Sequence, residues 1–417
     1  MELTKQHQVA LGTSRINAFR HSKRFPDASF NSIVSPNVDT LYSIAHLDLQ
    51  GQPLVMTIPD TRGRYFMMPI MDAWSNVVAS PGTRTLGSGA QTLLIVGPDW
   101  QGQTPQGMQL IRVPTRMGWI IGRIKTHGPS DYEQVHRLQD QFVLTPLDSR
   151  FGHKAYQAIA IPELDTHTAP DRQLAGWSSD SFFTRACRLL RDNPGRSDDA
   201  AILRRIREAG LLAQDCSTPQ SPLQRLGSEI GYRLAVRKLG ESQQLLAERK
   251  TYNGWNIGYG LGEYGVRYGQ RAMVAKIGFG ANTADDAIYP NLHQDSDGRP
   301  LNGARRYILH FPAEQLPPVK GFWSLTLYND RQALSANELD RYALGDRDPL
   351  QFNRDGSLDL YIQHERPVDP QHVANWLPAP ADGFNLFLRL YWPEPQVLDG
   401  RWLPPPIEVA ESTVGEG

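Results

Sequence analysis

The sequence contains little cysteine. Cys187 and Cys216 are the only two in 417 residues, and both fall in stretches of helix-forming residues. No Cys-x-x-Cys pair occurs, so nothing indicates a zinc ribbon or a dithiol redox centre. We therefore expect two thiols without a redox or metal-binding role.

The chain also lacks an excess of charge and a long apolar run. Lys and Arg total 43 and Asp and Glu total 44, which leaves a net charge of -1. Because no long basic run occurs, we do not expect nucleic acid or an anionic membrane as a partner. No apolar run reaches the length of a membrane span. The polar start, Met1–His7, is not followed by the apolar core of a signal segment, which predicts a cytoplasmic protein.

Several motifs of cofactor-dependent enzymes are missing. There is no Gly-Lys dipeptide, which excludes a Walker phosphate loop, and there is no Gly-x-Ser-x-Gly elbow or His-Glu-x-x-His helix. Gly260–Gly265 reads Gly-x-Gly-x-x-Gly, but aromatic residues and glycines precede it where a dinucleotide site needs a buried strand. We expect a loop there, followed by a helix over Gln270–Gly280. The sequence thus predicts no nucleotide or organic cofactor and leaves a metal ion open.

Turn residues and strand-like alternation are abundant at both ends of the chain. With Gly 36 and Pro 31, turns recur roughly every ten residues between apolar-polar alternating runs, as in antiparallel sandwiches and barrels. The predicted strands are Thr40–Leu49, Leu54–Ile58, Arg64–Ile70, Gln91–Val96, Met108–Val113, Gly118–Lys125, Arg305–Phe311, Phe322–Tyr328, Leu358–His364 and Phe384–Trp392. The predicted helices are Ser130–Val143, Ser181–Asp192, Asp198–Ala213 and one that starts at Ser221-Pro222 with Leu223, Leu226, Ile230 and Leu234 on one stripe.

This order predicts an α+β protein that is mainly β. We expect two antiparallel jelly-roll or sandwich-like β domains with a helical segment between them. The predicted boundaries are 1–150 for the first domain, 151–281 for the helical segment and 282–417 for the second domain.

A similar strand phrase occurs once in each predicted β domain. Asn37–Ser43 contains Asp39 and Tyr42, and Phe322–Asn329 contains Tyr328. Such polar aromatic strands are suited to line a pocket for a small organic acid or an aromatic ligand. Structural use of the same residues in a β-sandwich core is the competing interpretation. The further candidate binding residues are Tyr65, Arg84, Arg123, Tyr252, Trp255, Arg267, Arg271, Trp323, Arg389 and Tyr391.

Several strings carry a family resemblance that covers most of residues 30–408. The most specific are Phe322-Trp323-Ser324 and Asn375-Trp376-Leu377-Pro378-Ala379-Pro380, supported by Asn37–Ser43 and Val96–Trp100. On these residues the chain resembles a two-part bacterial family known as domains of unknown function 1254 and 1214. The resemblance implies two jelly-roll-like β domains with helices between them. It brings no settled activity and no agreed catalytic residues.

Together these features favour an enzyme that acts on a small organic molecule by proton transfer, such as a biosynthetic tailoring enzyme. Elimination, isomerisation, cyclisation and hydrolysis all fit. Asp39 or His310 would be the base and Tyr42 or Tyr328 the proton donor. The anion clamp would be Arg267, Arg271 or Arg389. Two alternatives stay open: a β-domain protein that only binds a ligand or another chain, and a jelly-roll metalloenzyme whose ligands spacing cannot reveal. A homo-oligomer also stays open.

Overall fold

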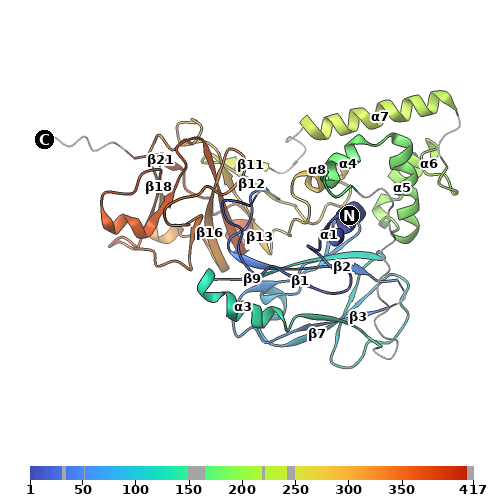
Figure 1. Cartoon of the computed structure of the whole chain (residues 1–417), viewed down its shortest axis with the longest axis horizontal. Helices are drawn as coiled ribbons and strands as arrows, with labels where there is room; N and C mark the ends of the chain where they lie inside the picture. Colours follow the sequence, from blue (N-terminus) through green and yellow to red (C-terminus); the bar gives the residue numbers. More distant parts are fainter. Residues whose placement is uncertain (31–33, 51, 149–164, 218–220, 242–248, 411–417) are drawn as a thin grey trace.

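The computed structural model describes residues 1–30, 34–50, 52–148, 165–217, 221–241 and 249–410. Two β units lie side by side along the long axis, and helices cover one side of the first unit (Figure 1). We call strands β1 to β10 the N-terminal β unit and strands β11 to β21 the C-terminal β unit. The predicted α+β class, mainly β, is confirmed; jelly-roll connectivity stays a prediction.

Two sheets form the N-terminal β unit, and one apolar core lies between them. All strand pairs are antiparallel except β7 with β8. The first sheet has the order β1 (Arg20–His21), β2 (Thr40–Asp48), β9 (Met117–Lys125), β5 (Ile70–Asp72), β6 (Val77–Ala79), with β4 (Phe66–Met67) also pairing β9. The second has the order β10 (Val143–Pro146), β3 (Leu54–Ile58), β7 (Gln91–Val96), β8 (Gln109–Arg112). The short helices α2 (Thr83–Leu86) and α3 (Tyr132–Gln139) complete the unit.

Two sheets also form the C-terminal β unit around a second core. The larger has the order β11 (Arg249–Tyr252), β12 (Trp255–Gly258), β14 (Asn291–Leu292), β20 (Phe384–Pro393), β16 (Val319–Asn329), β17 (Ala343–Gly345), with β13 (Ala287–Ile288) also on β20. The smaller has the order β19 (Trp376–Pro378), β18 (Leu358–Gln363), β15 (Tyr307–Phe311), β21 (Ile407–Val409), and α9 (Pro395–Leu398) follows β20. Strands β11 and β12 thus come from the range that the sequence assigned to the helical segment.

The helices outside the sheets gather beside the N-terminal β unit (Figure 1). They are α1 (Glu2–Ala10), α4 (Pro170–Gly176), α5 (Ser179–Asp192), α6 (Ala200–Glu208), α7 (Pro222–Glu241) and α8 (Tyr268–Ile277). The Ser178 hydroxyl caps α5 by accepting the Ser181 backbone N–H. A disulfide joins Cys187 to Cys216, so the two cysteines are not the free thiols that their spacing led us to expect. The pairing depends on how α5 packs against the segment after α6, which local sequence does not encode.

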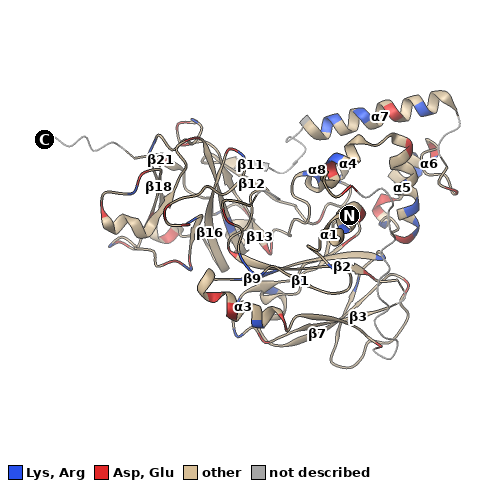
Figure 2. Cartoon of the chain, viewed as in Figure 1, with Lys and Arg blue, Asp and Glu red and all other residues tan. Residues whose placement is uncertain are grey.

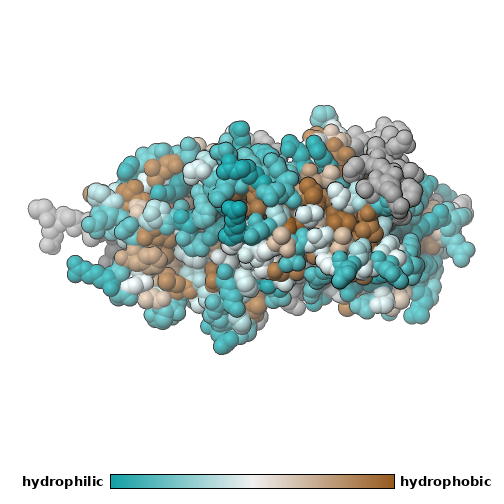
Figure 3. All heavy atoms as spheres, turned by 90° about the horizontal axis from the view of Figure 1, so that it is seen from below, coloured by the Kyte–Doolittle hydropathy of each residue, from teal (hydrophilic) through white to brown (hydrophobic). Residues whose placement is uncertain are grey.

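Helix α7 presents its predicted apolar stripe to solvent. Leu223, Leu226, Ile230 and Leu234 are all more than half exposed, and the inward side uses Tyr232 and Glu229 instead. Charged residues of both signs lie along α3, α5 and α7 (Figure 2). Seen from below, hydrophilic residues surround scattered apolar patches over both β units, an ordinary surface for a folded chain (Figure 3). Within the described ranges, no helix combines the length and apolar character needed to cross a membrane.

Side chains of four strands alternate between a β-unit core and the contact between the two β units. In β16, Trp323, Leu325 and Leu327 enter the C-terminal core, while the even-numbered residues face the other way. In β2, Leu41, Ala45 and Leu47 enter the N-terminal core and the even-numbered residues again face outward. The outward faces of β2 and β9 and of β16 and β20 therefore carry the polar residues that meet between the units.

Candidate functional site

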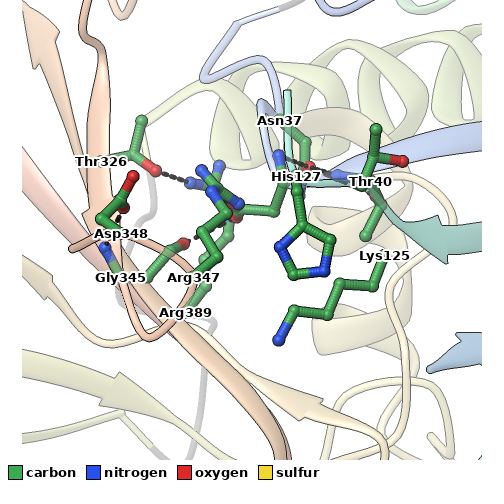
Figure 4. Close-up of polar contacts among 12 residues, drawn as sticks. Asn37, Thr40, Lys125, His127, Thr326, Gly345, Arg347, Asp348 and Arg389 are labelled. Carbon is green, nitrogen blue, oxygen red and sulfur yellow. Dashed lines mark hydrogen bonds and ion pairs between the residues drawn. The ribbon is translucent and has the colours of Figure 1, made fainter. Parts of the chain in front are cut away.

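A buried carboxylate lies at the contact between the β units. Asp39, just before β2, is 0% exposed. Its Oδ2 accepts a hydrogen bond from the Ser324 hydroxyl at 2.7 Å, and its Oδ1 accepts one from Arg347 at 2.6 Å. Arg347 follows β17 and its side chain is 9% exposed (Figure 4). Both oxygens of the predicted base are therefore bound by groups of the other β unit.

Two tyrosines of the C-terminal β unit reach the N-terminal unit in the same region. Tyr391 accepts a hydrogen bond from the Asn37 side-chain amide at 2.6 Å. Tyr328 donates to the Pro36 carbonyl at 2.7 Å and accepts from Arg389 at 2.5 Å. Arg389 also donates to Thr326 at 2.6 Å (Figure 4) and to the Ser35 carbonyl at 3.2 Å. We call Asn37, Asp39, Ser324, Tyr328, Arg347, Arg389 and Tyr391 the interface cluster.

The electrostatics of the interface cluster fix its protonation states. Burial raises the pKa of Tyr328 to about 12, and burial together with the nearby Tyr289 raises the pKa of Tyr391 well above its ordinary value. Burial alone would lower the pKa of Arg389, but Tyr328 and Asp39 raise it above its usual value. The arginines thus stay charged and these two tyrosines stay neutral near pH 7. This arrangement joins the two β units through charged arginines and neutral tyrosines.

A cavity of about 630 Å³ opens beside the interface cluster, and its floor is the outer face of β2 and β9. Three cross-strand pairs run along this face: Tyr42 opposite Arg123, Ile44 opposite Ile121, and His46 opposite Trp119. We call this space the β2/β9 cavity. Of these six residues all but His46 line the cavity, and the other lining residues are Gln8, Ser22, Arg24, Phe25, Pro26, Asp27, Ser29, Phe30, Ser35, Pro36, Asn37, Thr40, Phe279 and Gly280.

Close packing of one loop on the floor depends on Gly280. This residue has a φ of +89°, and a Cβ there would lie 2.3 Å from Ile121 and 3.2 Å from the Trp119 ring. Only glycine accepts both the backbone angle and the approach. The loop continues to Asn282, which accepts a hydrogen bond from Arg123 at 2.8 Å and donates one to the Tyr289 hydroxyl at 3.0 Å.

Arg123 is a buried cation beside the cavity. It is 7% exposed and donates to the Ile121 carbonyl and to Asn282, while its Nε has no hydrogen-bond partner among the described residues. Its guanidinium lies 5.1 Å from the centre of the Tyr42 ring. No carboxylate in the described part of the chain forms an ion pair with it. Burial would lower the pKa of Arg123, but Tyr42 and Tyr289 raise it above the usual value, so it carries its charge.

A second cavity of about 630 Å³ borders the same Phe25–Asp27 segment. Its charged residues have partners within the protein. Arg347 pairs with Asp39, Arg341 donates to the carbonyls of residues 373, 374 and 376, and Asp348 accepts the Gly345 N–H (Figure 4). Arg341 has no ion pair among the described residues either, but it is only partly buried, whereas Arg123 is 7% exposed.

Models of two protein families match the chain. The first, a protein of unknown function (DUF1254), matches residues 16–146, and the second, a protein of unknown function (DUF1214), matches residues 286–395. The chain belongs to this two-part family. The predicted family assignment is thereby confirmed, and the two matches correspond to the N-terminal and C-terminal β units.

Two solved structures resemble this family member. The VPA0106 protein from Vibrio parahaemolyticus is 23% identical with a TM-score of 0.73, and the alignment covers 98% of this chain and 96% of that one. A putative uncharacterized protein from Burkholderia cenocepacia is 13% identical with a TM-score of 0.48, covering 98% of this chain and 87% of that one. No curated protein matches the chain. The first likeness establishes a shared fold.

The structure brings eight of the fourteen predicted site residues to the contact between the β units or its border, among them Arg84 of α2, which pairs with Asp286 just before β13 at 2.6 Å. Asp39, Tyr328, Arg389 and Tyr391 belong to the interface cluster, and Tyr42 and Arg123 line the β2/β9 cavity. Tyr65 is 5% exposed and packs edge-on against the Phe322 and Tyr391 rings.

The other six lie elsewhere. Tyr252, Trp255 and Trp323 pack in or against the C-terminal core, where the Trp255 indole donates to the Pro405 carbonyl at 2.7 Å. Arg267 donates to carbonyls of its own loop, and Arg271 lies over the Trp74 and Tyr268 rings. His310 is half exposed and pairs with Asp359 on the smaller C-terminal sheet.

Sequence reasoning missed three residues that shape this region. Arg347 sits in a turn and Asn282 in a loop, so no periodicity marks either. Trp119, in contrast, is four residues before Arg123 in the predicted strand. Strand alternation places both on the odd-numbered face, so the sequence could have identified Trp119. As for metals, the described residues contain no group of three or more His, Cys, Asp or Glu side chains that could hold one.

Proposed function

We propose that the chain is an enzyme that binds a small organic acid in the β2/β9 cavity and acts on it by proton transfer. One observation carries the proposal: Arg123 is a buried guanidinium beside the cavity, with no carboxylate paired to it among the described residues. A buried charge without a counter-ion lowers the stability of the fold by roughly several kcal/mol, and an acid ligand would offset that cost.

Tyr42 is the proton donor in this proposal. It lines the same cavity, opposite Arg123 in the β2–β9 register, and it has no role in the interface cluster. Asp27 is the carboxylate that lines the cavity, and hydrogen bonds from the Ser29 side chain and backbone lower its pKa, so it is ionised near neutral pH. Asp27 therefore replaces Asp39 and His310 as our choice of base. Elimination, isomerisation, cyclisation and hydrolysis all remain compatible with such a pair.

Binding is tested first. A panel of aromatic and aliphatic carboxylates is screened by thermal shift, and the best ligands are measured by titration calorimetry. Arg123→Met should weaken binding at least tenfold. Arg267→Met, the matched control at a predicted clamp outside the cavity, should bind within about threefold of wild type. Equal binding by Arg123→Met and wild type contradicts the proposal.

Proton transfer is tested with the bound acids in D₂O. Wild-type protein should catalyse deuterium incorporation or product formation that is readable by NMR. Tyr42→Phe keeps the ring over Arg123 and should retain binding while losing at least about a hundredfold in rate. Asp27→Asn should show a comparable loss.

A non-enzymatic binding protein is the second candidate. It is favoured by the finding that Asp39 and Tyr328, two of the predicted catalytic residues, are held in contacts between the β units. Tight binding of acids with neither exchange nor product in wild-type protein would decide for it.

The cellular location stays a prediction, and one feature opposes it. The sequence predicts the cytoplasm, whereas a disulfide such as Cys187–Cys216 is typical of oxidising compartments. Alkylation of protein trapped directly from cells distinguishes the two: reduced thiols support the cytoplasm, and a protected pair supports export. Three further predictions are checked on the same preparation. Absorbance tests for an organic cofactor, elemental analysis tests for a bound metal, and light scattering tests for a homo-oligomer.

A further inference from the structure

The indole of Trp119 is a second buried donor on the floor of the β2/β9 cavity. Trp119 is 4% exposed and lines the cavity, and its Nε1 has no hydrogen-bond partner among the described residues. Buried indole N–H groups usually have an acceptor. Packing holds the ring in place, since it stacks on His46 at 5.2 Å between centroids and contacts Phe279 at 5.2 Å. The donor is therefore fixed in position.

Trp119 and Arg123 lie at opposite ends of one strip of floor. They occupy the same face of β9 four residues apart, which corresponds to roughly 13 Å between their Cα atoms. Ile121 lies between them on that face, and Ile44 lies opposite it on β2. The strip therefore runs from a cation, across an apolar middle, to a single neutral donor.

We infer that the ligand is an elongated organic acid with a neutral oxygen acceptor at its far end. Its acid group would bind Arg123, its apolar body would cover Ile44 and Ile121, and a carbonyl or hydroxyl oxygen would accept the Trp119 indole N–H. An uncharged group with one donor matches a neutral oxygen rather than a second acid. Trp119 is thus a specificity-determining residue. This inference rests on the proposed function and adds the far-end requirement to it.

Two probes that differ only at the far end test the inference. Para-acetyl-hydrocinnamate carries a carbonyl oxygen, and its para-isopropenyl analogue replaces that oxygen with a carbon of similar shape. Wild-type protein should bind the acetyl probe about tenfold more tightly by calorimetry, since a buried hydrogen bond is made in one case only. Trp119→Phe should reduce that ratio to within about twofold by weakening the acetyl probe alone. Trp100→Phe, outside the cavity, should keep the ratio.

Arg123→Met separates this inference from the proposed function. It should weaken both probes together and leave their ratio unchanged. A ratio that is unaltered in Trp119→Phe overturns the far-end contact while the role of Arg123 stands. Equal affinities in Arg123→Met and wild type overturn the proposed function itself. If the acid panel binds but neither probe binds wild-type protein at millimolar concentration, only the elongated ligand class is overturned.

A second measurement needs no variant that must fold. In protein labelled with ¹⁵N at tryptophan, the acetyl probe should move the Trp119 indole N–H resonance downfield, as a new hydrogen bond requires. The isopropenyl probe should leave it within the spread of the other indoles. Equal shifts with both probes contradict the inference. The resonance is assigned from its loss in Trp119→Phe or, if that variant does not fold, from its proximity to the Phe279 ring in NOE spectra.

Discussion

The interface cluster and the β2/β9 cavity contain the same types of residue but differ in whether their buried polar groups have hydrogen-bond partners. In the cluster, both oxygens of Asp39 and the hydroxyls of Tyr328 and Tyr391 are bound by groups of the protein. On the cavity floor, Arg123 and Trp119 each keep a buried donor without a partner among the described residues. Buried polar groups that are fully paired stabilise a single arrangement, whereas unpaired ones cost stability. We therefore propose that the pairing of a residue, rather than its type, distinguishes the contact between the β units from the proposed binding site.

The largest effect is expected from breaking the buried ion pair of the cluster. Arg347→Met leaves the Asp39 carboxylate buried without its cation and should lower the free energy of unfolding by about 3–5 kcal/mol. Chemical denaturation measures it. Arg366→Met removes the exposed Arg366–Glu338 pair and should cost about 0.5 kcal/mol or less. Similar costs for both variants would show that the cluster does not hold the β units together.

The next comparison is between two buried arginines. Arg389→Met abandons Thr326, Tyr328 and the Ser35 carbonyl and should cost about 2–4 kcal/mol. Arg123→Met abandons Asn282 and the Ile121 carbonyl but also removes a buried charge without a counter-ion, so about 1 kcal/mol or less is expected. Only Arg123→Met should weaken acid binding. The reverse order of stability costs would refute the contrast between the two regions.

These contrasts were only partly predictable from the sequence. Strands β3 and β7 match their predicted bounds, and β2, β9, β16 and β20 differ by a few residues at most, because period-two alternation is a local signal. Parity along β9 even places Trp119 and Arg123 on one face. The partners of Asp39 were not predictable, since Arg347 lies 308 residues away in a turn. The exposed stripe of α7 shows the same limit: its period identifies the helix but not the side that faces inward.

The alkaline limb of stability should contain a contribution from Tyr328 of the cluster, which a Tyr328→Phe variant isolates from those of the other buried tyrosines. Burial raises the pKa of Tyr328 to about 12 from the ordinary value of 10. Between these values the unfolded chain loses the proton and the folded chain keeps it, so stability falls as pH rises. Over that window Tyr328 contributes about 2–3 kcal/mol of the loss. Denaturation curves of wild type and Tyr328→Phe should run parallel below pH 9 and converge above pH 10. Curves that stay parallel to pH 12 would contradict the buried hydroxyl.

The smallest effect on stability should accompany the largest effect on chemistry. Tyr42→Phe keeps the ring over Arg123 and leaves the interface cluster intact, so unfolding should change by only about 0.5 kcal/mol. Tyr391→Phe, its matched partner in the cluster, removes the acceptor of the Asn37 amide and should cost about 1–2 kcal/mol. Proton exchange into a bound acid should be lost in Tyr42→Phe and retained in Tyr391→Phe. The contrary outcome is that both variants lose proton exchange, each in proportion to its loss of unfolding free energy. Both would then act through the contact between the β units, and the cavity would have no chemistry of its own.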